Sequence, residues 1–126
     1  MSVSEAHPLH YAMTPKLAAF DFDSTLMDGE TIDILAAAVG RGAEVAAVTE
    51  AAMRGELDFF GALTARAQLL AGLPYETALD ICRALPLMPG ARETVQGLRE
   101  RGCRVVVFSG GFREATRHHA RVLGAD

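Results

Sequence analysis

Lysine is almost absent from this sequence: Lys16 is the only one, and arginines supply the rest of the positive charge. The formal net charge is -4 at pH 7, and the arginines are scattered rather than gathered in a run. A protein that binds nucleic acid or an anionic membrane surface needs a basic patch to neutralise phosphates. The composition therefore favours neither kind of partner.

Long apolar runs and cysteines are also scarce. The longest apolar stretch, residues 34–39, is far shorter than the roughly 18 residues of a membrane-spanning helix. Cys82 and Cys103 form neither a disulfide framework nor a metal-site spacing, and we interpret them as small buried hydrophobic residues. Residues 1–15 are polar without a signal-peptide pattern, which predicts a flexible N-terminal tail. Together these features predict a cytoplasmic protein.

The rest of the sequence alternates between strand-like and helix-like segments. Short apolar or β-branched stretches at residues 17–22 and 104–108 predict buried strands. Apolar residues at helical spacing predict helices at 31–39, 43–54, 58–71, 74–85, 91–101 and 112–123. A crossover between two parallel strands predicts an α/β protein. The helices at 31–85 exceed what one crossover needs, so we expect them to form an inserted helical cap.

Two carboxylates, Asp21 and Asp23, lie at the carboxyl end of the first predicted strand. Open α/β sheets bind ligands at the carboxyl ends of their strands, so we expect both side chains in that crevice. One carboxylate could attack phosphorus to form an acyl phosphate, and the other could act as general acid and base. Their oxygens also suit Mg²⁺, a hard cation. The Asp-x-Asp-Ser pattern equally suits an Asx turn and a helix cap, so the spacing alone leaves both interpretations open.

Two segments resemble signatures of the haloacid dehalogenase (HAD) superfamily of phosphatases. They are Asp21-Phe22-Asp23-Ser24-Thr25 after the first strand and Ser109-Gly110-Gly111-Phe112 after the second. Between them, Glu30-Thr31-Ile32-Asp33, residues 52–59, Leu63, Arg66 and residues 89–91 resemble phosphoserine phosphatases in particular. The resemblance implies a partial HAD-like Rossmannoid parallel core, residues 16–30 and 86–126. The helical cap, residues 31–85, would be inserted after the first strand.

The resemblance also implies a role for each matching residue around the phosphate. Asp21 would be the nucleophile and a Mg²⁺ ligand, and Asp23 would be the general acid and base, with its backbone carbonyl on Mg²⁺. Ser109 and the backbone N–H of Gly110 would bind the phosphoryl oxygens, because glycine allows close approach and a helix N-terminus follows. The implied reaction is hydrolysis of O-phosphoserine to serine and phosphate through an aspartyl phosphate.

Recognition of the serine part of the substrate is implied for residues of the cap. Glu30 would lie near its ammonium group, and Arg66 would bind its carboxylate with a two-point fork. Phe59 lies two helical turns before Arg66, on the same face, and could shield the pocket from water. His118 and His119 are adjacent on a helix and point about 100° apart, so one site cannot use both. We expect them at surface and boundary positions, with His119 on the inward side of its helix together with Ala115 and Val122.

The family pattern continues beyond the second signature with a lysine and a glycine-aspartate signature that adds Mg²⁺ ligands. This sequence has no lysine after Lys16 and no Asp-Gly pair after Asp28-Gly29. The pattern thus predicts the N-terminal part of such a phosphatase. Losing one preorganised electrostatic group typically costs about 10²- to 10³-fold in rate. We therefore expect weak or no turnover by this chain alone.

The first strand would be central in the complete sheet of the family, so one of its edges has no partner here. We expect self-association, domain swapping, or completion by a C-terminal polypeptide. Three hypotheses for the function stay open. The first is a phosphoserine phosphatase, and the second is a non-catalytic module that binds phosphoserine or serine or serves in assembly. The third is a phosphatase for another small phosphorylated metabolite.

Overall fold

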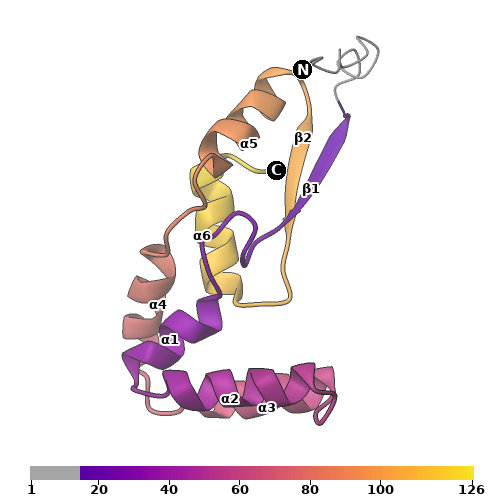
Figure 1. The fold of residues 1–126 in the computed structure, drawn as a ribbon. Coiled ribbons are helices and arrows are strands. Elements are labelled where there is room, and N and C mark those ends of the chain that lie inside the picture. Colours follow the sequence, from indigo (N-terminus) through magenta and orange to yellow (C-terminus); the bar gives the residue numbers. More distant parts are fainter. Residues whose placement is uncertain (1–14) are drawn as a thin grey trace, which may run out of the picture.

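A computed structural model describes residues 15–126 (Figure 1). The predicted tail lies outside the described residues except for Pro15. The elements are β1 (Leu17–Asp21), α1 (Thr31–Ala38), α2 (Gly42–Met53), α3 (Phe59–Gln68), α4 (Tyr75–Arg83), α5 (Ala91–Glu100), β2 (Arg104–Phe108) and α6 (Arg113–Leu123). Both predicted strands and all six predicted helices are present, with ends shifted by a few residues.

The two strands pair in parallel, as the crossover predicted. Leu17 lies opposite Arg104 and Asp21 lies opposite Phe108. Because this register aligns the carboxyl ends of both strands, the loops that follow them begin side by side. The α/β fold with helices inserted after the first strand is therefore confirmed, and the first two residues of each loop lie at one end of the sheet.

The core lies between the strands and the helices that flank β2. Figure 1 shows α5 and α6 on the same side of the strands, and both helices contact β2. Val105 is fully buried on this face, with Ala18, Phe20 and Val107 partly buried beside it. The main hydrophobic cluster contains Phe22, Leu26, Met27, Leu35, Cys82, Leu85, Ala91, Val95, Val105, Ala115 and Leu123. This cluster fixes the loop after β1 against α6.

The opposite face of the sheet is open in the described part of the chain. Strand alternation directs Leu17, Ala19, Val106 and Phe108 to this face. Leu17 is 56% exposed and Phe108 is 68% exposed. Within residues 15–126, β1 pairs only with β2, so its other edge has no neighbouring strand. A two-stranded sheet with one apolar face uncovered is marginally stable by itself.

The four helices between the strands divide into an outer and an inner pair. α2 and α3 pack on each other at the end of the molecule farthest from the strands (Figure 1). α1 and α4 lie between this pair and the core, and their Leu35 and Cys82 belong to the main cluster. The boundaries of cap and core at residues 31–85 therefore stay a prediction, because these helices share the core. Within residues 15–126, no helix is both long and apolar enough to cross a membrane.

Candidate active site

The loops after β1 and β2 meet the cap at a cavity of about 210 Å³. All seven site residues expected from the sequence line it: Asp21, Asp23, Glu30, Phe59, Arg66, Ser109 and Gly110. The core loops supply one wall, and the start of α1 together with α3 supplies the other. Segments far apart in the sequence thus converge on one cavity.

The residue between the two carboxylates in the sequence, Phe22, has a buried aromatic ring. Phe22 is 1% exposed, and its ring stacks on His119 of α6 with 5.5 Å between ring centroids. Because Phe22 points into the core, Asp21 and Asp23 on either side of it are directed out of the core and into the cavity. The backbone N–H groups of Leu26 and Met27 both donate to the Phe22 carbonyl at 3.0 Å, which closes the loop around it.

Asp21 ends β1 and is exposed at the mouth of the cavity. Its Oδ1 accepts a hydrogen bond from the Phe22 backbone N–H at 2.7 Å. Within residues 15–126, no donor bonds the second carboxylate oxygen of Asp21. That oxygen can approach a ligand without first breaking an interaction inside the chain.

Asp23 is half-buried and holds the start of the cap. Its Oδ1 accepts hydrogen bonds from the Thr31 backbone N–H at 2.9 Å and from the Thr31 hydroxyl at 2.5 Å. Asp23 therefore caps α1 and also faces the cavity. Of the two interpretations that the spacing left open, the hydrogen bonds confirm the helix cap, and the position of Asp23 at the cavity leaves the reactive carboxylate as a prediction.

The loop after β2 faces the two aspartates. The Gly111 backbone N–H donates to the Ser109 Oγ at 3.0 Å, which holds the serine side chain at the cavity. The loop leads directly into α6, whose N-cap residue Phe112 has an extended backbone and no side-chain capping bond. The N–H groups at a helix start carry partial positive charge, so this end of α6 favours an anion nearby.

The wall formed by the cap contains both charged residues assigned to substrate recognition. Glu30 precedes α1, and its Oε1 accepts a hydrogen bond from the Ser24 hydroxyl at 2.8 Å. Ser24 has a φ of 56°, which is unusual for a residue other than glycine and marks a tightly constrained loop. Phe59 and Arg66 lie on one face of α3, as their spacing predicted, and both line the cavity.

Negative charge dominates this cavity. Asp21, Asp23 and Glu30 face a single guanidinium, that of Arg66. The Arg66 Nε donates to the Ala62 carbonyl at 3.3 Å, and no carboxylate of residues 15–126 forms an ion pair with Arg66. The guanidinium therefore has donors left for a ligand carboxylate.

The donor set can be tested for Mg²⁺. Magnesium usually takes one or two carboxylates, several waters and substrate phosphate oxygens. Asp21 offers one carboxylate, with one oxygen that has no donor in the described residues, and the Asp23 backbone carbonyl can add a second oxygen. Over residues 15–126, no group of three or more His, Cys, Asp or Glu side chains could hold a metal. The chain therefore fits a weak, partly hydrated Mg²⁺ site rather than a closed one.

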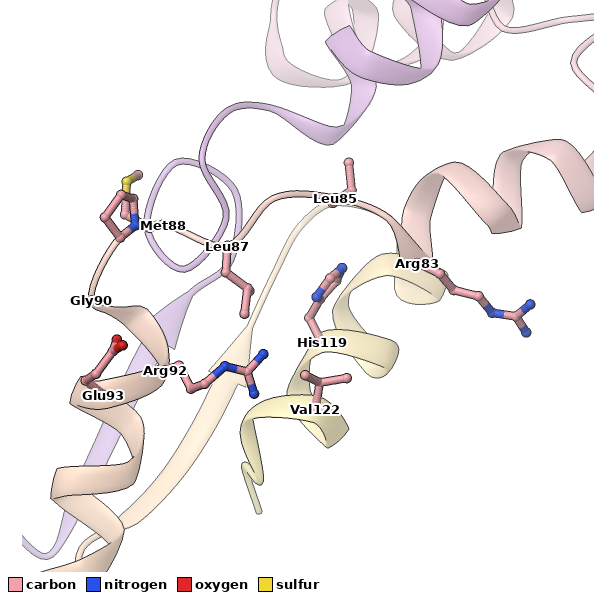
Figure 2. A pocket seen from close by; sticks show the side chains of 10 residues that line it. Arg83, Leu85, Leu87, Met88, Gly90, Arg92, Glu93, His119 and Val122 are labelled. Carbon is pink, nitrogen blue, oxygen red and sulfur yellow. The ribbon is translucent and has the colours of Figure 1, made fainter.

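A second, larger cavity of about 480 Å³ lies where α4, α5 and α6 meet (Figure 2). In the view of Figure 2, His119 of α6 lies between Leu87 and Arg83, and the Arg83 side chain extends outward from the end of α4. The His119 Nε2 lies 2.9 Å from the Cys82 carbonyl oxygen, so this nitrogen carries the ring proton. Nδ1 is buried and has no hydrogen-bond partner in the described structure. His119 is only 4% exposed, so the expected surface or boundary position is wrong for it.

Six further residues line the site or support it, and the sequence interpretation assigned them no role: Ser24, Thr31, Ile32, Leu63, Gly111 and Phe112. Two of them gave a local signal. The second glycine of a Gly-Gly pair indicates close backbone approach. A threonine at the first position of a helix that begins after a carboxylate-rich loop indicates a capping interaction.

The chain thus combines a parallel α/β core, an Asp-x-Asp pair and a Ser-Gly-Gly loop at its strand ends, and a helical insertion above them. Residues 15–126 match the haloacid dehalogenase-like hydrolase family, and the chain belongs to that family. The fold and the ordered motifs agree with this assignment.

Within the family, the chain is similar to phosphoserine phosphatases. It is 54% identical to that of Wolinella succinogenes over 111 residues, which are 88% of this chain and 54% of the relative. It is 52% identical to phosphoserine phosphatase SerB2 of Mycobacterium tuberculosis over 113 residues, which are 90% of this chain and 28% of the relative. A solved phospho-aspartyl intermediate analogue of phosphoserine phosphatase superposes with a TM-score of 0.79 at 41% identity, over 90% of this chain and 55% of that one. The chain spans about half the length of the first of these relatives and of the solved structure, and less of the second relative.

Proposed function

We propose that this chain carries the nucleophile and the substrate-recognition wall of a Mg²⁺-dependent phosphomonoesterase that hydrolyses O-phosphoserine. One observation carries the proposal: a single cavity joins Asp21 and Asp23 to the Ser109–Gly111 loop and, on the cap side, to Glu30 and Arg66. A solved relative is described as a substrate-bound phosphoserine phosphatase complex, and the chain is 40% identical to it with a TM-score of 0.79.

The arrangement of charges supports an amino acid phosphate as substrate. Arg66 has guanidinium donors free of any ion pair in residues 15–126, and a guanidinium matches a carboxylate at two points. Glu30 offers a carboxylate to an ammonium group, and Ser24 holds one of its oxygens. Ser109 and the start of α6 would receive the phosphoryl oxygens. Phe59 lines the same cavity and would help to exclude water from it.

In the first chemical step, a carboxylate oxygen of Asp21 attacks phosphorus. An O–P bond forms while the bond between phosphorus and the serine oxygen breaks. Asp23 gives its proton to the departing oxygen, so serine leaves with a neutral hydroxyl. The phosphoryl group remains on Asp21 as an aspartyl phosphate. A phospho-aspartyl intermediate analogue is among the solved relatives, which supports this step.

In the second step, water replaces Asp21 on phosphorus. Asp23, now a carboxylate, takes a proton from the water as its oxygen attacks. The bond between phosphorus and Asp21 breaks, inorganic phosphate leaves, and both aspartates return to their starting forms. The Thr31 hydrogen bonds hold one oxygen of Asp23 throughout, so proton transfer falls to the other oxygen.

The bound Mg²⁺ would offset negative charge on the phosphoryl oxygens. Asp21 and Asp23 would hold it. Arg66 lies on the cap side with the amino acid part of the substrate, so the chain offers little other positive charge near the phosphate. Repulsion between Asp21 and the phosphate is thus poorly offset, and we expect slow turnover by this chain alone.

The open sheet supports a partner that completes the site. The outer side of the strand ends forms a cavity of about 400 Å³ lined by Ala19, Phe20, Asp21, Phe108, Ser109 and Gly110. This cavity is contiguous with the candidate active site, since Asp21, Ser109 and Gly110 line both. A second copy of the chain would add more acidic groups. We therefore favour a complementing polypeptide that brings a strand and a positive charge.

A non-catalytic module that binds phosphoserine or serine is the alternative. The lack of a cluster of three or more metal-ligating side chains in residues 15–126 favours it. In this version the cavity, Glu30 and Arg66 bind the ligand, and Asp21 has no covalent role. Either function is proposed for the cytoplasm, in keeping with two free cysteines.

The two functions are separated by phosphate release from O-phosphoserine with and without Mg²⁺. The wild-type chain should release phosphate slowly and become labelled by phosphoserine carrying ³²P in its phosphate. Asp21→Asn should abolish both signals without reducing ligand binding. Binding without release or label, at any Mg²⁺ concentration, would establish the module instead. If the chain neither binds O-phosphoserine nor releases phosphate from it, both proposals fail.

A further inference from the structure

The hydrogen bonds around Asp23 link the acid and base group to the first residue of the cap. Thr31 is 1% exposed, and both its backbone N–H and its hydroxyl donate to the Asp23 Oδ1, at 2.9 Å and 2.5 Å. A buried hydroxyl without an acceptor would be costly, and the carboxylate oxygen supplies that acceptor. The pair of bonds fixes both the position and the rotation of the Asp23 side chain.

The side chain of the residue at the N-cap position of α1 does not itself accept hydrogen bonds from the first turn of the helix. Glu30 occupies the N-cap position with an extended backbone but forms no capping hydrogen bond. Its carboxylate bonds to the Ser24 hydroxyl instead and lines the cavity. The first-turn N–H groups of a helix need acceptors, and Asp23 provides one from across the loop. Glu30 thereby stays available for the ligand.

The other oxygen of Asp23 is restricted from the opposite side. A Cβ built on Gly111 would lie 2.8 Å from the Asp23 Oδ2 and 3.2 Å from the Ser109 Oγ. Oδ2 therefore lies closely against the backbone of the phosphate-binding loop. With Oδ1 held by Thr31, only Oδ2 can exchange a proton with a group in the cavity.

We propose that Thr31 is a positioning residue for Asp23: its hydroxyl and N–H hold Oδ1, which directs Oδ2 toward the phosphoryl group and ties that orientation to the cap. This inference rests on the proposed function, because it assigns Asp23 to proton transfer. It makes Thr31 a determinant of the chemical step, whereas Glu30 and Arg66 determine binding.

The test compares Thr31→Val, which keeps the shape and the N–H, with Thr31→Ser, which keeps the hydroxyl. Loss of one buried hydrogen bond to a charged group predicts a fall in kcat of about 10- to 100-fold for Thr31→Val, with KM for O-phosphoserine unchanged. Thr31→Ser should restore most of kcat. Thr49→Val is the matched control, because the half-buried Thr49 hydroxyl bonds only the Val45 carbonyl of its own helix.

A spectroscopic measurement examines the hydrogen bond without turnover. In ¹H–¹⁵N spectra of the whole chain, Asp23→Ala removes the acceptor, so it should shift the Thr31 amide resonance and speed its hydrogen exchange. Amides near the end of α1 should keep their exchange rates. An unchanged Thr31 amide would show that the bond to Asp23 does not exist in solution.

The outcomes separate this inference from the proposed function. Equal kcat values for Thr31→Val and the wild type, in a chain that releases phosphate, would overturn the positioning role alone. A rise in KM together with the fall in kcat would show that Thr31 only maintains the cap, and would also overturn it. A wild-type chain without phosphate release would remove the proposed function and the role of Thr31 in it, and would leave the hydrogen bond to be judged by the amide spectra.

Discussion

Gly111 lies so close to Asp23 that a Cβ at position 111 would stand 2.8 Å from the Asp23 Oδ2. Real side chains essentially never tolerate that distance, and Thr31 holds the other Asp23 oxygen, so the carboxylate cannot move away freely. Gly111→Ala should therefore displace Asp23 and Ser109. We expect phosphate release to fall by about 10²-fold or more, the loss typical of a misplaced general acid, while the fold persists.

Gly97→Ala provides the matched control for this substitution. Gly97 lies inside α5, and a Cβ there meets no atom within 4 Å. Alanine is favoured over glycine in a helix interior, so Gly97→Ala should raise the free energy of unfolding by about 0.5–1 kcal/mol and leave phosphate release unchanged. Urea unfolding and a phosphate assay on both variants check the pair. Full activity of Gly111→Ala would contradict the close contact.

Arg66→Ala should weaken binding of O-phosphoserine by about 10- to 100-fold, since a hydrogen bond to a charged group contributes about 1.5–3 kcal/mol. Arg66→Lys should recover only part of this loss, because an ammonium group cannot present a two-point fork to a carboxylate. Calorimetry in the Asp21→Asn background measures binding without hydrolysis.

Arg83→Ala is the control for Arg66. Arg83 ends α4, its side chain is 53% exposed, and its ion pair with Asp80 spans 3.9 Å. Such a surface pair contributes little, so neither affinity nor stability should change measurably. Equal affinities of Arg66→Ala and Arg83→Ala for O-phosphoserine would exclude Arg66 from substrate recognition.

Much of the site could be predicted from the sequence because its residues occupy fixed places relative to secondary structure. Asp21 and Ser109 follow strands, and parallel pairing brings the ends of those strands together without further information. Phe59 and Arg66 share a helical face because of their spacing alone. The glycines and prolines between apolar stretches located the helices for the same local reason.

The remaining features depend on contacts between segments. The sequence could not show that Asp23 caps α1, because the loop between residues 23 and 31 had to fold back first. The helical spacing of residues 115, 119 and 122 indicated that His119 faces inward, but it could not show how deeply the ring would be buried. The acceptor of its hydrogen bond, the Cys82 carbonyl, follows another helical segment and gives no signal in the sequence around His119.

The open edge of β1 predicts how the chain associates. The chain should form a one-to-one complex with the remaining part of the Wolinella succinogenes phosphoserine phosphatase, and phosphate release should rise in that complex. Ala19→Asp places a charge on the uncovered face of β1 and should prevent the complex from forming. Ala47→Asp, on an exposed position of α2, should not. Light scattering measures the masses of the chain and of the complex. If the chain alone forms a dimer, and Ala19→Asp disrupts this dimer, self-association would be favoured over a complementing polypeptide.

The burial of His119 predicts that stability falls as the solution becomes acidic. Burial lowers the pKa of His119 from its ordinary value of 6.5, an effect that its hydrogen bond to the Cys82 carbonyl opposes and the nearby His118 reinforces. The folded state therefore favours the neutral ring, whereas the unfolded chain takes up a proton near its ordinary pKa. Since the unfolded state binds more protons, this contribution to stability is present above about pH 6.5 and is lost as the pH falls below it.

Urea unfolding between about pH 7.5 and 5.5 measures the slope of the free energy of unfolding against pH. His119→Gln keeps a donor for the Cys82 carbonyl and cannot be protonated, so its slope should be shallower than that of the wild type, while His118→Gln should change the slope much less. Equal slopes for His119→Gln and the wild type would show that the ring is accessible to protons in the folded state.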